Sequence, residues 1–414
     1  MMNAAPERIF YGWWAVAAAF LNLFFVVGII FYGFPVFYAS FVESLGFTRA
    51  QVTQGFFLGF LIIGLPSGLL AGAVIDRVGA RWVIVTGAAL VASSLALMAR
   101  MTKLWEYEAL CVMEVLGYVL AGPIANQVLV SKWFRARRGR AMGLAYLGLG
   151  AGGVVAPLLA NYFVRMYGWR HALEGIAIAL AAVLFPVGIA VTRSSPEEVG
   201  LQPDGEGAAV YEVSVSRETV GSSGITEALG TRNFWLIVAG STLAIGAIGA
   251  VIQHFILFLK DQGYTATVAA RFSTGLLVAS LAGRILVGYA VDHVSKKNAM
   301  ALFYFLMGAS VLLLGMAKQP AAAWTFALVF GFSMGADYML VPLVTAESFG
   351  TGSLGKLLAL IIMGYSLGQW GMPWMVGKIF DGRHSYDLAW KITAVAGMIG
   401  GLAIYAIRPG KAVT

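Results

Sequence analysis

The chain has 414 residues, of which 59% are hydrophobic and 12% charged, and its formal net charge is +8 at pH 7. A soluble domain carries roughly 25% charged residues, so this chain lacks the polar surface that a water-soluble fold requires. Composition therefore excludes a soluble enzyme and a disordered chain, and it indicates a polytopic membrane protein. The basic residues are spread over short polar segments between apolar runs, a distribution that is informative about membrane topology. We therefore predict no nucleic-acid partner from the positive net charge.

Long apolar runs indicate that the chain crosses the bilayer as helices. The run VAAAFLNLFFVVGIIFYGF, residues 16–34, contains no charged side chain. A spanning helix needs about 20 apolar residues, whereas a membrane barrel shows short segments of alternating polarity. We therefore predict an all-α membrane protein with twelve transmembrane helices, the first of which is too long to be a signal peptide. The predicted helices cover residues 10–44, 48–76, 80–100, 105–132, 138–165, 169–192, 232–260, 265–292, 297–317, 321–347, 354–380 and 386–408.

The two halves of the sequence look like repeats. GAVIDRVGARW at residues 72–82 recurs as GYAVDHVSKKN at residues 288–298, an offset of 216 residues that Pro157 and Pro373 share. Parallel six-helix repeats are a transporter architecture in which the substrate binds between the halves near the middle of the membrane. A polar stretch rich in Gly, Ser and Pro separates the repeats. We predict an N-terminal six-helix bundle over residues 1–193, a cytoplasmic linker over 194–231 and a C-terminal six-helix bundle over 232–414.

The distribution of basic residues orients the predicted helices. Cytoplasmic loops are enriched in Lys and Arg. The densest basic block, SKWFRARRGR at residues 131–140, lies between the fourth and fifth predicted helices. This block is cytoplasmic only if the N-terminus is cytoplasmic as well. We therefore predict a multi-pass protein of the cell (inner) membrane with both termini in the cytoplasm.

Several motifs resemble those of the major facilitator superfamily. GAVIDRVGARW is similar to the signature loop of that family between helices 2 and 3, written G-x-x-x-D-R-x-G-x-R. Five further features resemble the bacterial monocarboxylate transporter-like and oxalate–formate antiporter branch. They are YGWW, FYGFP, SKWFRARRGRAMG, SPEEVGLQPDG and an Arg deep in helix 8. The resemblance implies two six-helix pseudo-repeats and secondary transport by alternating access. It also implies that the Arg of helix 8 anchors a substrate carboxylate.

Arg284 is the main candidate for a substrate-binding residue. It precedes Asp292, at the predicted cytoplasmic end of its helix, by eight residues, which corresponds to about 12 Å of helix. An ionised side chain at the centre of a membrane helix costs at least about 2.5–3.5 kcal/mol. Because Arg stays protonated, it requires a partner or an anionic ligand, and a carboxylate matches its guanidinium group. The alternative is a structural Arg in a fixed ion pair between helices.

Three titratable residues are candidates for proton coupling. Asp337 is predicted at a depth similar to that of Arg284, as its resting partner or as a proton carrier. His254 and Asp261 are seven residues apart on one predicted helix face, near the outer mouth. The alternatives are a permanent structural pair or a hydrogen-bonded helix contact for Asp337, a satisfied polar contact for His254 and a solvated helix end for Asp261.

Polar side chains within predicted helices are candidates to line the cavity, because phenol and amide groups donate hydrogen bonds to a carboxylate. Each is also compatible with a packing role alone. The candidates are Tyr32, Tyr118, Asn126, Tyr146, Tyr338, Tyr365 and Gln369. A second group, in the repeated loops, is predicted to control opening of the cytoplasmic side, with a plain turn as the alternative. This gating group consists of Asp76, Arg77, Gly79, Arg81 and Asp292.

The sequence departs from the family at charged positions. Val36 and Ser280 stand where animal monocarboxylate transporters carry a Lys and an Asp, and the predicted helix 11 lacks the central Lys of oxalate antiporters. One buried cation suits one carboxylate, so we predict a proton-coupled carrier of a small monocarboxylate such as lactate or pyruvate. The alternatives are a carboxylate antiporter, a carrier of a larger organic acid, or a membrane sensor or intramembrane enzyme.

No cofactor is predicted. The four histidines and the single Cys show no metal-ligand spacing, and GLGAGG at residues 148–153 lies within a predicted membrane helix rather than after a strand, so it predicts no phosphate site. We expect the partners to be a small organic anion, a proton and the lipid bilayer. We also expect the protein to function as a monomer and to have no enzymatic activity.

Overall fold

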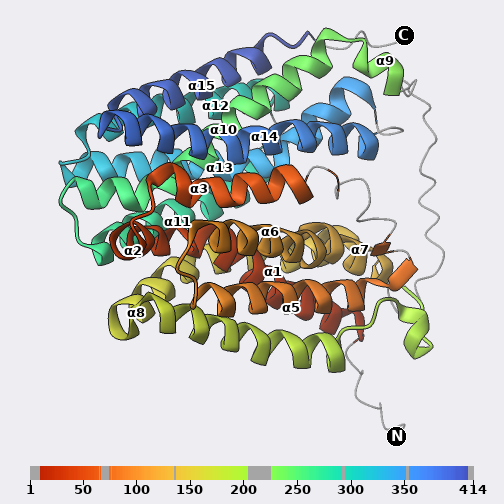
Figure 1. Ribbon diagram of the computed structural model, residues 1–414. Helices are drawn as coiled ribbons and strands as arrows, with labels where there is room; N and C mark the ends of the chain where they lie inside the picture. The colour runs from red at the N-terminus through yellow and green to blue at the C-terminus, as the bar shows by residue number, and fades with distance from the viewer. Residues whose placement is uncertain are drawn as a thin grey trace, which may run out of the picture.

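The computed structural model describes residues 10–64, 66, 74–75, 77–134, 137–203, 225–290, 294–350 and 354–408. These residues are predominantly helical and include no strand (Figure 1). By length and composition, eight of the described helices are suited to cross a membrane, and the bent helix near residues 320–349 adds a ninth. The prediction of an all-α membrane protein is confirmed for this part of the chain.

The first half of the chain forms a bundle in which each predicted span is helical over most of its described part. Figure 1 shows it in red to yellow-green. Its helices are α1 (Gly12–Val27), η1 (Gly28–Gly33), α2 (Pro35–Leu45), α3 (Arg49–Gly59), η2 (Phe60–Gly64), α5 (Ala80–Met98), α6 (Leu104–Ala121), α7 (Pro123–Trp133), α8 (Arg138–Pro186) and η3 (Val187–Val191).

The second half forms the bundle drawn in green to blue in Figure 1. It is preceded by two short elements, η4 (Pro196–Val199) and α9 (Ile225–Leu229), that lie within the predicted linker. Residues 204–224 lie outside the described part, so the division at residues 194 and 231 stays a prediction. The helices of this half are α10 (Arg232–Asp261), α11 (Ala266–Ala290), α12 (Lys296–Val311), η6 (Leu312–Met316), α13 (Pro320–Phe349), α14 (Leu354–Arg383) and α15 (Asp387–Tyr405).

A glycine divides α8 into two consecutive spans. Gly168 has a φ of 78°, which disfavours residues that carry a Cβ, and it interrupts the helical backbone. The sequence predicts a break between residues 165 and 169, which includes this position. Pro157 in α8 and Pro373 in α14 both lie inside helices, so the offset of 216 residues relates similar local structures.

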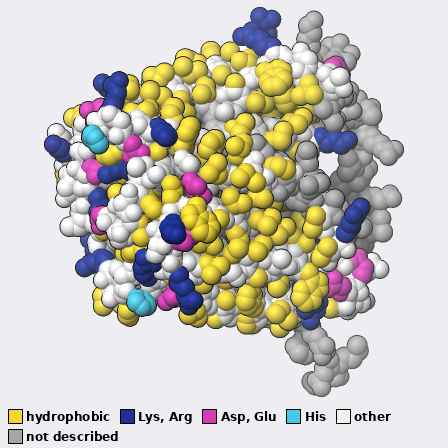
Figure 2. Space-filling model, viewed as in Figure 1, with side chains coloured by type: hydrophobic (Ala, Val, Ile, Leu, Met, Phe, Trp, Pro, Cys, Tyr) yellow, Lys and Arg dark blue, Asp and Glu magenta, His cyan; other side chains and the backbone are white. Residues whose placement is uncertain are grey.

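The two bundles meet along α3 with α14, α8 with α11, and α2 with α10. Aromatic rings fill part of this contact: Trp370 of α14 stacks on Phe60 of η2 with ring centroids 4.4 Å apart. Hydrophobic side chains cover the middle of the visible face, and charged side chains gather toward its ends (Figure 2). Leu286 is 57% exposed although it is strongly apolar, as expected for a side chain that faces lipid.

Glycines bring α11 and α13 into close contact. A Cβ on Gly335 of α13 would lie 2.0 Å from the carbonyl oxygen of Ser280, and a Cβ on Gly283 of α11 would lie 2.2 Å from that of Phe332. Small residues at such positions allow membrane helices to approach closely. Because Gly283 and Gly335 are adjacent in sequence to Arg284 and near Asp337, this contact sets the distance between two candidate site residues.

We expect Gly335→Ala to force α11 and α13 apart, because the added methyl group meets backbone atoms that cannot rotate away. Overpacking of this kind typically costs about 1–3 kcal/mol. Thermal unfolding of the purified protein in detergent should show a lower midpoint than in wild type. Gly175→Ala on α8 is the matched control, since its Cβ would meet nothing within 4 Å. Equal midpoints for Gly335→Ala and wild type would contradict this account of the helix contact.

Candidate functional site

Four of the tyrosines predicted to line a cavity form one interior cluster. Tyr118 of α6 lies within electrostatic range of Tyr32 of η1 and Tyr146 of α8, and Tyr365 of α14 lies within range of Tyr118 and Tyr146. We call these four residues the tyrosine cluster. Since Tyr365 comes from the second half and the others from the first, the cluster includes residues of both halves.

A carboxylate and a guanidinium lie beside this cluster. Asp337 of α13 is 7% exposed, and its carboxylate accepts a hydrogen bond from the hydroxyl of Tyr304 on α12. The hydroxyl oxygens of Tyr304 and Ser241 are 3.4 Å apart. Asp337 is within electrostatic range of both Arg284 and Tyr365. The arrangement therefore presents opposite charges and phenol donors to one interior region.

An open cavity of about 370 Å³ lies between α7 and the start of α8. Its lining includes Gln127 and Ser131 of α7 and Tyr146 of α8, and Gln127 donates a hydrogen bond of 2.5 Å to the hydroxyl of Tyr146. The nearby Trp133 donates to the carbonyl of Arg193, where the predicted linker begins. We call this the linker end. Because Tyr146 belongs to both groups, the tyrosine cluster borders the cavity.

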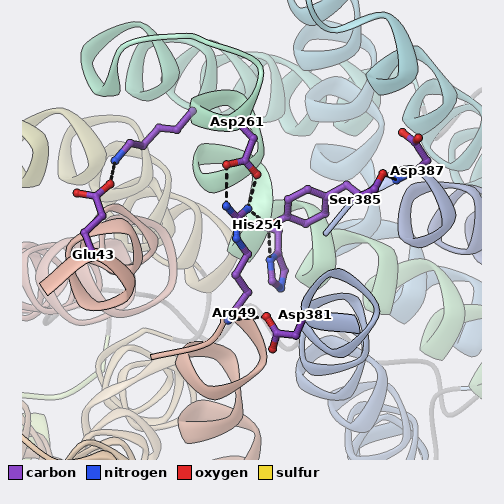
Figure 3. A network of polar contacts seen from close by, with 9 residues as sticks. Glu43, Arg49, His254, Asp261, Asp381, Ser385 and Asp387 are labelled. Atoms are coloured by element: carbon purple, nitrogen blue, oxygen red, sulfur yellow. Dashed lines mark hydrogen bonds and ion pairs between the residues drawn. The ribbon is translucent and has the colours of Figure 1, made fainter. Parts of the chain in front are cut away.

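The opposite end is closed by an ion pair between the halves (Figure 3). Arg49 of α3 binds both carboxylate oxygens of Asp261 on α10, at 2.6 and 2.7 Å, and donates to the hydroxyl of Tyr386 at 2.8 Å. Its guanidinium also lies 3.8 Å from the ring centroid of Phe380. A bidentate pair of this type is geometrically specific. We call this the Arg49 end.

Two further contacts join the halves at the Arg49 end. The carboxylate of Asp381 on α14 accepts hydrogen bonds from the backbone N–H groups of Arg49 and Ala50, at 3.0 and 2.9 Å. These groups begin α3, where free N–H donors and the helix dipole favour a negative charge. Lys260 and Glu43 form an ion pair of 2.6 Å. The Arg49 end therefore holds the two bundles together through charges of both signs.

The two outer candidates for proton coupling lie in this network. Asp261 is the carboxylate that binds Arg49. His254 is fully buried, and its ring nitrogens lie 3.0 Å from the hydroxyl of Tyr386 and 2.8 Å from the carbonyl oxygen of Pro373. A carbonyl oxygen only accepts, so Nε2 carries a proton, whereas the hydroxyl of Tyr386 can donate to Nδ1 or accept from it. The role of both residues in proton coupling stays a prediction.

The remaining candidates are placed as follows. Asn126 is buried and donates to the carbonyls of Ala121 and Gly122, which closes the end of α6. Gln369 is half-buried on α14, where its backbone oxygen would lie 2.0 Å from a Cβ on Gly249. The side chain of Tyr338 lies outside the described part.

The gating candidates are only partly described, since Asp76 and Asp292 lie outside the described residues. Gly79 has a φ of 87° and begins α5, which explains a glycine there. Arg81 donates to the carbonyls of Gly188 and Ile189 and therefore ties α5 to the end of the sixth span, within the first half. Arg77 is exposed. A role of these residues in gating stays a prediction.

Sequence reasoning missed most of the Arg49 network and the phenol that binds Asp337. Arg49, Asp381 and Tyr386 lie at predicted helix ends, where charged and aromatic side chains are common, so none stood out. Tyr304 lies in an apolar run in which an aromatic residue is expected in the core. One feature of the sequence indicates a contact between Arg49 and Asp381: they carry opposite charges and lie at the same predicted depth in different halves.

We expect Arg49→Gln to open the Arg49 end. Removing one partner of a hydrogen-bonded, partly buried charge pair costs about 2–5 kcal/mol, whereas an exposed pair contributes about 0.2–1 kcal/mol. Spin labels attached through Ser44→Cys and Lys318→Cys, which are exposed on opposite halves, should report a longer distance in Arg49→Gln. The native Cys111 is buried and should not be labelled. Lys260→Gln, which removes the more exposed ion pair, is the control, and an equal effect of both variants would refute a dominant role for Arg49.

Comparison with known proteins places the fold in a family. Residues 18–373 match the family model described as Major Facilitator Superfamily. Monocarboxylate transporter 13 of Bos taurus is 26% identical across 98% of this chain and 91% of its own length. Riboflavin transporter MCH5 of Saccharomyces cerevisiae is 22% identical across 86% of this chain and 69% of its own length.

Solved structures show the same fold. The nucleoside transporter NupG (D323A mutant) superposes with a TM-score of 0.73 at 12% identity, over 96% of this chain and 99% of the other. The predicted resemblance to the superfamily is confirmed, and its relatives include monocarboxylate transporter-like proteins, while the oxalate–formate branch stays a prediction. The protein is thus an all-α, multi-pass membrane protein of a transporter family, and family membership makes it a carrier of a small molecule rather than an enzyme. Since the matched region covers most of its length, the chain belongs to the Major Facilitator Superfamily.

Proposed function

We propose that the protein transports a small monocarboxylate together with a proton by alternating access. The observation that carries this proposal is that Arg284 and Asp337, on neighbouring helices, lie within electrostatic range of each other, and that Asp337 also lies within range of Tyr365 of the tyrosine cluster. A guanidinium in an apolar interior favours an anion, and a carboxylate matches it with two parallel hydrogen bonds. The similarity to monocarboxylate transporter 13 supports the same substrate class.

Competition for one cation provides the coupling of proton to anion. While Asp337 is ionised, its charge balances Arg284 and disfavours a second anion beside it. A proton on Asp337 removes that negative charge, and the substrate carboxylate then replaces it as the partner of Arg284. The hydroxyl of Tyr304 stays within hydrogen-bonding reach of Asp337 in both protonation states, because a phenol both donates and accepts. Proton and anion therefore bind together.

The two ends of the bundle support alternating access in one direction. The Arg49 end joins the halves through ion pairs, whereas the linker end has a cavity that borders the tyrosine cluster. The predicted topology places the linker in the cytoplasm, which assigns this conformation as inward-facing with the Arg49 end closed toward the outside. Transport then requires the Arg49 network to break while contacts form at the other end.

We expect Arg284→Gln to lose most uptake of labelled lactate or pyruvate into proteoliposomes under an inward proton gradient. Hydrogen bonds to a charged group contribute about 1.5–3 kcal/mol, which corresponds to roughly 10–100-fold weaker binding. Arg271→Gln on the same helix, where the side chain is exposed, should retain uptake. Undiminished uptake by Arg284→Gln with an unchanged melting temperature would refute the assignment.

We expect Asp337→Asn to separate exchange from proton-driven accumulation. Asn resembles the protonated acid in shape and charge, so the substrate should still exchange across the membrane. The variant releases no proton, so a pH gradient should no longer drive accumulation above equilibrium. Counterflow and uphill uptake in the same proteoliposomes measure the two activities. Asp387→Asn, at an exposed helix start, is the control, and gradient-driven accumulation by Asp337→Asn would contradict proton coupling at this residue.

A carrier of a larger organic acid is the second candidate, and the similarity to a riboflavin transporter favours a larger substrate. A ligand that binds the folded state raises the melting temperature, so a thermal-shift screen against acids of increasing size distinguishes the two candidates. Stabilisation by lactate or pyruvate supports the first candidate. Stabilisation only by larger aromatic acids supports the second.

A further inference from the structure

Glu114 is a buried acid that the proposed site does not use. It lies in the interior of α6, its exposed fraction is 0%, and neither carboxyl oxygen has a hydrogen-bond partner among the described residues. It precedes Tyr118 of the tyrosine cluster by four residues, or about one helical turn. Acids within membrane helices are rare and mark functional sites by default.

The surroundings of Glu114 favour its neutral form. An ionised carboxylate without a partner is very costly in an apolar interior, and such a group holds a proton instead. The cations on the helices packed against α6 lie elsewhere: Arg49 binds Asp261, Arg81 binds carbonyl groups of the sixth span, and Lys132 lies near the end of α7. We therefore assign Glu114 as a protonated carboxylic acid in this conformation.

The titratable neighbours of Glu114 are few among the described residues. Tyr38 of α2 and Tyr107 and Cys111 of α6 itself lie within its electrostatic range. The described parts of α1 and η2 carry no ionisable side chain, and Arg49 and Arg81 are the only ionisable residues in α3 and α5. Of Tyr38, Tyr107 and Cys111, Tyr38 is the one with a hydrogen bond to a described residue of the other half of the protein.

Tyr38 links the environment of Glu114 to the conformation of the Arg49 end. Its hydroxyl donates a hydrogen bond of 2.7 Å to Oε1 of Gln253 on α10, and both side chains are buried. This bond crosses between the halves, so it breaks when α2 and α10 separate. The hydroxyl of Tyr38 then needs another acceptor, and water gains access. A donor and water both stabilise an ionised carboxylate.

We propose that Glu114 is a proton-binding site that must be filled before the Arg49 end can close. In the open conformation, water and the released Tyr38 allow Glu114 to ionise. Closure removes both and buries the carboxyl group, which therefore takes up one proton. The conformation that binds more protons is favoured at low pH, so this site favours closure as the pH falls.

Protonation of the acids at the Arg49 end shifts the equilibrium between closed and open protein in the direction opposite to protonation of Glu114. The contribution of Glu114 to the pH dependence can therefore be separated from theirs. Protonation of Asp261, Asp381 or Glu43 removes a charge that holds the halves together, so these groups favour opening as the pH falls. Protonation of His254 on α10 would add a positive charge within electrostatic range of Arg49 in the other half, which would also favour opening. Among these five groups, Glu114 alone is expected to favour closure on protonation.

The test measures the distance between labels at Ser44→Cys and Lys318→Cys across a pH series, without substrate, in wild type and Glu114→Gln. At low pH, the ratio of closed to open protein should be the same in wild type and in Glu114→Gln, because Gln resembles the protonated acid. At pH values where Glu114 ionises in the open conformation, this ratio in wild type should fall below that of Glu114→Gln, by up to tenfold per pH unit. Glu108→Gln, on the same helix with its acid bonded to Gln54, is the matched control and should follow wild type. Identical pH dependence in wild type and Glu114→Gln would overturn the proposal.

The melting temperature of Glu114→Gln shows whether this variant folds. If it does not fold, a second measurement tests the proposal. Infrared spectroscopy distinguishes a protonated carboxyl group from a carboxylate. The closed protein at neutral pH should show a protonated carboxyl absorption that is absent in Glu114→Leu, and its presence in Glu114→Leu at wild-type intensity would also overturn the proposal. Neither measurement uses transport, so both remain informative if the protein carries no monocarboxylate.

Discussion

The cost of placing a charge in an apolar interior organises the polar residues of this protein. The surroundings of each interior acid either compensate its charge or keep the acid neutral. Asp337 accepts a hydrogen bond from Tyr304 and lies within electrostatic range of Arg284, while Glu114 has no partner in the described part of the chain and is assigned as neutral. The close contact of α11 and α13 through glycines makes the first arrangement possible, since it brings the two charged residues to adjacent helices.

The same constraint explains why the Arg49 end is a suitable place for a reversible closure. Arg49 is neither buried deeply nor fully exposed: its side chain is 12% exposed and that of Asp261 34%. Such a pair is strong enough to hold two bundles together with the help of Asp381 and Tyr386, and its charges return to water when it breaks. A purely apolar contact of the same area would leave hydrophobic surface in water on opening.

The sequence predicts the helices because lipid requires long apolar runs, and it predicts the break near Gly168 because polar residues and a glycine interrupt one of them. Arg284 stands out as a single charge within such a run. Glu114 has the same signature within the run at residues 105–132 and could have been recognised by the same argument. The pairing of Arg49 with Asp261 could not be predicted from the sequence, because the two residues are 212 positions apart and many other charged residues also lie at helix ends.

The positions of the two interior acids suggest that they solve different problems. Asp337 lies in the second half beside the proposed anion site, so its proton bears on whether an anion binds. Glu114 lies in the first half beside Tyr38, whose hydrogen bond to Gln253 exists only while the halves meet, so its proton bears on whether the Arg49 end closes. A carrier that couples two gradients must link ligand occupancy to conformation as well as to charge. Two acids in different halves of the protein meet both requirements, whereas one acid at the anion site would link the proton to binding alone.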